Sequence, residues 1–105
     1  MSDTITDLIR PFMDDALLRL DPQHTVTCWD FSTCIVPSQN QMQTVAVITV
    51  RARNSLLGHP DYTNCDVVPA SGFVVNQTNV DRSLANSMAR FAAMRAETTR
   101  MPTSA

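Results

Sequence analysis

Residues 25–53, TVTCWDFSTCIVPSQNQMQTVAVITVRAR, decide the fold of this chain. They hold two runs rich in β-branched and aromatic residues, Thr25–Val36 and Met42–Arg53, and the polar segment Pro37–Gln41 lies between them. Residues of these types favour strands, and a short polar segment between two strands favours a turn. The stretch therefore predicts a β-hairpin.

Helical patterns flank this hairpin on both sides. From Thr4 to Leu20 the apolar residues recur at helical spacing and form one stripe, while Pro11 falls on the polar arc. A second such pattern begins at Thr78 and runs to about Glu97. We therefore expect one helix before the hairpin and one near the end of the chain.

A third strand region, Cys65–Val75, is interrupted at Pro69–Gly72, so it forms either one irregular strand or two short ones. The order α-β-β-β-α predicts an α+β fold: a three-stranded antiparallel sheet, or a four-stranded one if this region splits, with two helices packed on one face. We expect one domain over residues 1–97, because 105 residues bury only one core. Residues 98–105 have no periodicity and predict a flexible tail.

Composition narrows the classes of partner. Hydrophobic residues make up 44% and charged residues 17%, which excludes disordered, collagen-like and coiled-coil proteins. The net charge is −2 and all basic residues are Arg, so neither nucleic acid nor a membrane is the expected partner. The polar, acidic opening Met1–Thr4 is unlike a secretory signal. An odd number of cysteines, 3, is typical of reduced thiols, which we expect to be buried. We expect the chain to be cytoplasmic during its synthesis.

The sequence predicts no catalytic residues, no metal and no cofactor. His24 and Cys28 are about 13 Å apart on a strand at ~3.3 Å per residue, which is too far for them to share a metal. The other candidate ligands, His59 and Cys65, are not part of a closely spaced ligand pair such as Cys-x-x-Cys. The alternative is a small enzyme or ligand-binding module that uses the loop 54–65, where a Cys–His pair could form. Its residues would be His59, Asp61, Tyr62 and Cys65.

The order α-β-β-β-α resembles that of the double-stranded-RNA-binding domain. The segment Val80–Asn86 occupies the place where that family has the basic start of its second helix. The resemblance implies RNA binding as a second alternative. The segment has only Arg82 in place of a lysine cluster, and Arg51 and Arg53 are the only basic strand residues.

Neither strand of the hairpin has a fully polar side. Two helices can cover one face of a three-stranded sheet, so a partner must cover the other face. The loop leucines either fold back onto the core or contribute to a contact surface. We expect the interface to use Trp29, Phe31, Val45, Val47, Leu56, Leu57, Tyr62, Arg82 and Arg90.

These observations predict a non-enzymatic structural or assembly protein that forms homo-oligomers. Size and composition favour a bacteriophage component, such as a tail or head-tail joining protein, that would reside in the virion. Residues 1–21 carry a charge of −3 and residues 80–105 a charge of +2, which predicts directional, salt-sensitive contacts between copies. The alternative is that the two helices are neighbours in one subunit and their charges meet there.

Overall fold

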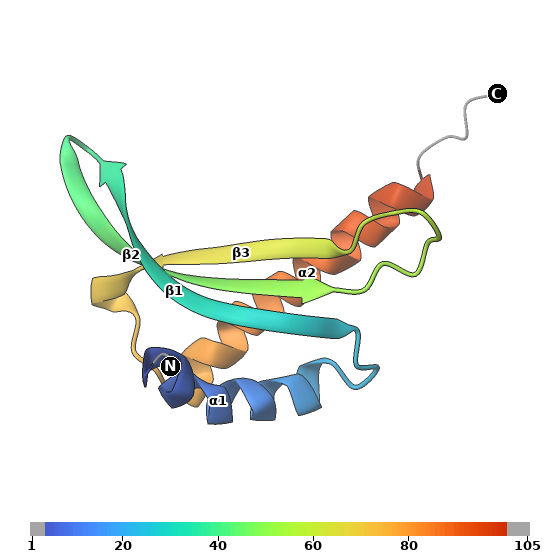
Figure 1. The fold of residues 1–105 in the computed structure, drawn as a ribbon, viewed down its shortest axis with the longest axis horizontal. Helices are drawn as coiled ribbons and strands as arrows, with labels where there is room; N and C mark the ends of the chain where they lie inside the picture. The colour runs from blue at the N-terminus through green and yellow to red at the C-terminus, as the bar shows by residue number, and fades with distance from the viewer. Residues whose placement is uncertain (1–3, 101–105) are drawn as a thin grey trace.

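The computed structural model describes residues 4–100 and confirms the predicted α-β-β-β-α order (Figure 1). Three antiparallel strands form an open sheet in the order β1-β2-β3, so the fold is α+β. The interruption after Pro69 is a short 3-10 helix and does not begin a fourth strand. The elements are α1 (Thr4–Leu20), β1 (Val26–Ser38), β2 (Gln41–Ala52), β3 (Tyr62–Pro69), η1 (Ala70–Gly72) and α2 (Gln77–Arg100).

The hairpin is longer than its sequence pattern predicts. Ser38 pairs with Gln41, so only Gln39 and Asn40 form the turn, and both have positive φ, 51° and 66°. Tight hairpin turns of this kind need positive φ at both central positions, which asparagine tolerates. The third strand ends at Pro69, opposite Val45, and the hairpin continues beyond it as a two-stranded arm (Figure 1).

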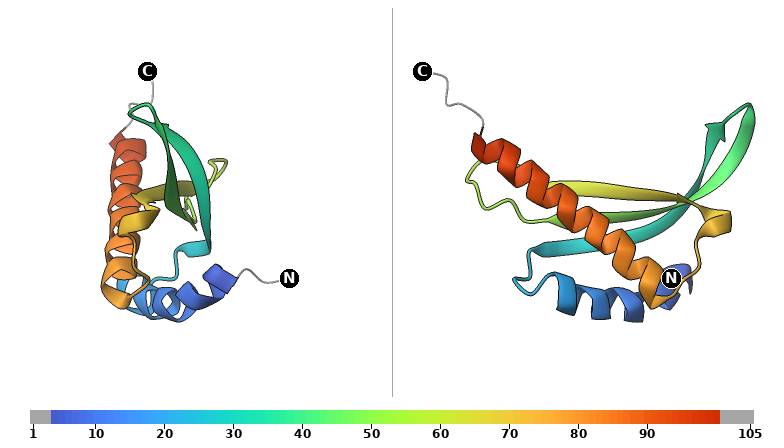
Figure 2. Two further views of the ribbon diagram at one scale, coloured as in Figure 1. Left: turned by 90° about the vertical axis from the view of Figure 1, so that its left-hand side faces the viewer. Right: turned by 180° about the vertical axis from the view of Figure 1, so that it is seen from behind.

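Both helices pack on the same face of the sheet, as predicted (Figure 2). Their apolar stripes meet the strand residues that point toward them, and together they form one core. Tyr62 of β3 and Phe91 of α2 stack in this core with ring centroids 6.3 Å apart. The core residues are Ile9, Met13, Ala16, Phe31, Ala46, Ile48, Val50, Ala52, Tyr62, Val80, Leu84 and Phe91.

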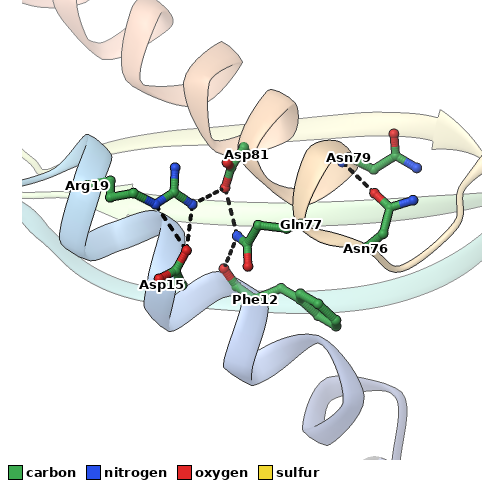
Figure 3. Close-up of polar contacts among 7 residues, drawn as sticks. All are labelled: Phe12, Asp15, Arg19, Asn76, Gln77, Asn79 and Asp81. Atoms are coloured by element: carbon green, nitrogen blue, oxygen red, sulfur yellow. Dashed lines mark hydrogen bonds and ion pairs between the residues drawn. The ribbon is translucent and has the colours of Figure 1, made fainter.

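Asn76 caps the second helix, which begins at Gln77, one residue before the predicted start. The Asn79 backbone N–H donates to Asn76 Oδ1 at 2.8 Å, the hydrogen bond that an N-cap side chain supplies (Figure 3). At the other end the helix continues to Arg100, so Thr98–Arg100 extend it beyond the predicted end. The rest of the predicted tail, residues 101–105, lies outside the described residues.

Between residues 4 and 100, no helix is long and apolar enough to cross a membrane.

Candidate interaction surfaces

The sheet face opposite the helices has no helix or strand of residues 4–100 over it (Figures 1 and 2). We call it the uncovered face. Its members follow from the strand register, because side chains alternate between the two sides of a sheet. They are Cys28, Asp30, Ser32, Cys34 and Val36 on β1, Gln43, Val45, Val47, Thr49 and Arg51 on β2, and Thr63, Cys65, Val67 and Pro69 on β3.

The uncovered face is apolar at its centre and carries little charge. Val47 of the central strand lies opposite Val67 of β3, whose side chain is 53% exposed. All three cysteines lie on this face as free, exposed thiols, so the expectation that they are buried is wrong. Asp30 and Arg51 are its only charged residues. A sheet surface that faces water is usually polar, so this one resembles a contact surface more than a solvated one.

Trp29 and Phe31 do not lie with Val45 and Val47 on the uncovered face, so their predicted placement is wrong. Phe31 is opposite Ile48, faces the helices and is only 4% exposed. The Arg10 guanidinium lies over the Trp29 ring, 5.5 Å from its centroid. The strand alternation is evident in the sequence, but which side the helices cover depends on tertiary packing.

A second candidate surface is the loop 53–61, which its own hydrogen bonds hold in place. The Asn54 backbone N–H donates to Asp61 Oδ1 at 3.1 Å, and its side-chain amide donates to the Pro60 carbonyl at 3.1 Å. The Leu56 backbone N–H donates a hydrogen bond to Asn54 Oδ1 at 3.0 Å. Leu57 at the tip is fully exposed, at 101%, and Leu56 is 43% exposed. Neither leucine folds back onto the core.

The residues of the enzyme alternative are not brought together. Tyr62 begins β3, faces the helices and is 9% exposed, whereas Cys65 lies on the uncovered face. Asp61 accepts the Asn54 hydrogen bond that closes the loop, and His59 is exposed. Within residues 4–100, no group of three or more His, Cys, Asp or Glu side chains is placed to hold a metal ion.

Arg82 and Arg90 are exposed on α2, on the helix side of the sheet. The Arg82 guanidinium donates to Asn79 Oδ1 at 3.5 Å. Arg90 lines a recess at the edge of β3 together with Asn64 and with Cys65 of the uncovered face. The predicted interface residues are therefore spread over the uncovered face, the loop, the core and the second helix.

Sequence reasoning missed a hollow beside the turn that joins α1 to β1. It has a volume of about 300 Å³, and its apolar lining comes from Leu17, Leu18 and Val26. Leu18 falls on the polar arc of the first helix and is 69% exposed. An apolar residue on an otherwise polar arc was the available signal. The rim of the hollow is formed by Asp14, Asp21 and His24.

The hairpin arm is a further surface that the sequence pattern did not reveal. Ile35 and Met42 lie on its helix-facing side, beyond the reach of both helices, and are 63% and 67% exposed. The arm projects from the body of the molecule (Figure 1).

Comparisons of this chain with protein-family models, with curated proteins and with solved structures find no match. The likeness to the double-stranded-RNA-binding domain thus rests on element order.

Proposed function

We propose that this chain is a non-enzymatic structural protein that self-associates through the uncovered face, with a second copy of the chain as its partner. The observation that carries the proposal is the exposed apolar centre of that face. Val67, which is 53% exposed, lies opposite Val47 there, and Cys65 and Cys34 lie next to this pair along the strands. Burial of such apolar surface against a partner contributes favourably to the free energy of association, because it removes that surface from water.

The charges of the uncovered face suit a second copy. The negative charge of Asp30 and the positive charge of Arg51 cancel, so two such faces can meet without net electrostatic repulsion. A two-fold axis in the plane of the contact can bring Asp30 of one copy opposite Arg51 of the other, because a two-fold contact uses the same patch twice. Each face then supplies both the acid and the base that the other needs.

We infer further that the self-associated protein is a component of a larger assembly, such as a bacteriophage tail or head-tail joining structure. The support is the small size of the chain, its lysine-free composition and low charge, and the projecting arm with Ile35 and Met42. Rings or tubes in negative-stain micrographs of concentrated protein are the expected result. A uniform population of isolated single copies would contradict it.

Val67→Asp tests the face contact. Sedimentation at tens of micromolar is expected to give an oligomer for the unchanged chain. The variant is expected to lose this contact, because each copy would bury an unpaired charge. Val67 is at the sheet surface, so the circular dichroism spectrum should not change. Ala93→Asp, on the exposed side of α2, is the matched control and should associate normally. A monomeric unchanged chain, or a Val67→Asp variant that associates like the control, would contradict the proposal.

The native thiols provide a second measurement. Cys34 and Cys65 border the apolar centre, so a maleimide reagent should modify them faster in dilute samples than in concentrated ones. Equal rates of modification at all protein concentrations would show that the uncovered face stays open.

A further inference from the structure

We propose that a second contact between copies inserts Leu57 of one chain into the hollow lined by Leu17, Leu18 and Val26 of another, reciprocally about a two-fold axis. This inference rests on the proposed self-association, but it uses a surface separate from the uncovered face.

The loop has the properties of a preorganised anchor. Leu57 is fully exposed, at 101%, although three hydrogen bonds centred on Asn54 hold the loop that presents it. Gly58, the next residue, has φ of +82°, a backbone conformation that glycine adopts without strain and that turns the chain at the tip. A loop that is already held in one conformation loses little backbone freedom when the side chain at its tip binds.

The hollow has the properties of a receptor for such a side chain. Leu17, Leu18 and Val26 supply an apolar lining, and a volume of about 300 Å³ exceeds that of one leucine side chain. Asp21 on its rim already accepts hydrogen bonds from Thr25 and Val26, so the turn beside the hollow is held in one conformation.

The loop 53–61 and the turn between α1 and β1, beside which the hollow lies, are at the same end of the molecule (Figure 1). Val26 at the start of β1 pairs with Ala52 at the end of β2, and the Arg53 backbone N–H donates to the Thr25 carbonyl at 2.8 Å. When two copies meet at this end about a two-fold axis, each Leu57 can face the other copy's hollow. Both hollows are then filled by the same symmetric contact.

Charge at this end favours the same pairing. Arg53 and Arg95 line a recess at the base of the loop, together with Ser55 and His24, while Asp14 lies on the rim of the hollow. A reciprocal contact brings the basic side of one copy toward the acidic rim of the other. Copies that join through both this end and the uncovered face would form an extended chain or a closed ring.

Four variants and a control separate the two contacts. Leu57→Asp and Leu18→Asp should each raise the dissociation constant of the end contact by roughly tenfold or more. Both substitutions would place a charged side chain in the apolar binding site. Each should leave dimers joined through the uncovered face. Val67→Asp should instead leave dimers joined at the end, and Leu57→Asp combined with Val67→Asp should give monomers. His59→Asp adds the same charge to the same loop, at an exposed position outside both the hollow and the basic recess, and serves as the matched control.

Cross-linking tests the contact directly. In a chain with all three native cysteines replaced by serine, Leu57→Cys molecules are mixed with Leu18→Cys molecules and treated with a short bis-maleimide. A mixed cross-linked pair should form more efficiently than with His59→Cys in place of Leu57→Cys. Equal yields from the two pairs would overturn the inference, as would unchanged association of Leu57→Asp. Loss of association in Leu57→Asp without the mixed pair would also overturn it, since Leu57 would then bind elsewhere.

Discussion

Arg19 of α1 and Asp81 of α2 form an ion pair of 2.8 Å, although they are 62 positions apart in the chain (Figure 3). The Arg19 guanidinium also binds Asp15 at 2.7 Å, and the Gln77 side-chain amide joins Asp81 to the Phe12 carbonyl. The hydrogen bonds from Arg19 and then Gln77 lower the pKa of Asp81. The two helices are thus neighbours in one subunit, and this contact pairs a base on the first helix with an acid on the second.

Replacing either partner of this pair should weaken the contact between the helices only slightly. Arg19→Gln and Asp81→Asn are each expected to give a small decrease in the midpoint of thermal unfolding, because ion pairs at the surface are screened by water and salt. The decrease should be smaller in concentrated salt. A double-mutant cycle measures the coupling, and a decrease that does not depend on salt would contradict an electrostatic origin.

Asp21 stabilises the turn between α1 and β1 and should make the folded protein sensitive to acid. Burial alone would raise the pKa of its carboxyl group. Hydrogen bonds from the Val26 backbone and from the hydroxyl and backbone of Thr25 outweigh burial, so the pKa lies below its usual value. Asp21→Ala leaves these donors without their acceptor, and we expect a loss of about 2 kcal/mol in the free energy of unfolding at neutral pH.

The pH dependence of this loss has a definite sign. A carboxyl group with a lowered folded pKa stabilises the protein above its unfolded pKa of about 4, and its contribution falls as the pH drops through the folded pKa. The stability difference between the unchanged chain and Asp21→Ala, measured by urea denaturation, should therefore shrink below about pH 4. Asp7→Asn, at an exposed position, is the control. A difference that stays constant down to pH 2 would contradict this role of the ionised carboxylate.

Ser87 lies completely buried on α2, at 0% exposure, where its hydroxyl oxygen accepts a hydrogen bond of 3.0 Å from the Asn64 amide. Ser87→Ala should lose about 1 kcal/mol from this bond, and the higher helix propensity of alanine should offset part of the loss. Asn64→Ala, alone and combined with Ser87→Ala, isolates the hydrogen bond by equilibrium denaturation. Losses that add without coupling would show that the bond does not stabilise the fold.

Pro11 lies exposed within the continuous helix α1. A proline inside a helix removes one backbone hydrogen bond, so Pro11→Ala should raise the midpoint of thermal unfolding. Asp14→Ala, at another exposed position of the same helix, is a control for the gain in helix propensity alone. A decrease with Pro11→Ala would mean that the backbone geometry imposed by proline is needed for packing.

Local patterns predicted the elements of this fold because helices and strands leave different periods in the sequence. The hairpin, the two helices and their shared face follow from those periods. The buried serines do not. Ser83 and Ser87 are buried on α2 because Asp66 and Asn64 of β3 supply their hydrogen-bond partners. These partners are 17 and 23 positions away in the chain, and nothing in the local sequence around a serine indicates such a distant partner.

The candidate surfaces depended more on tertiary structure. The sequence predicted an uncovered sheet face and a contact loop, and it named Val45, Val47 and Leu57 among their residues. It could not decide which side of the strands the helices cover, because alternation defines two faces without saying which one packs. For that reason it placed Phe31 on the wrong face.

The sequence by itself determined the order of the elements, the antiparallel hairpin and the low charge of the chain, because these depend on residues that are close together along it. Tertiary structure decided which face stays open, and it brought the thiols Cys28, Cys34 and Cys65 onto that face. It also placed Leu57 and the hollow around Leu18 at the same end of the molecule. These relationships depend on strand register and helix docking, which are set by packing between distant segments.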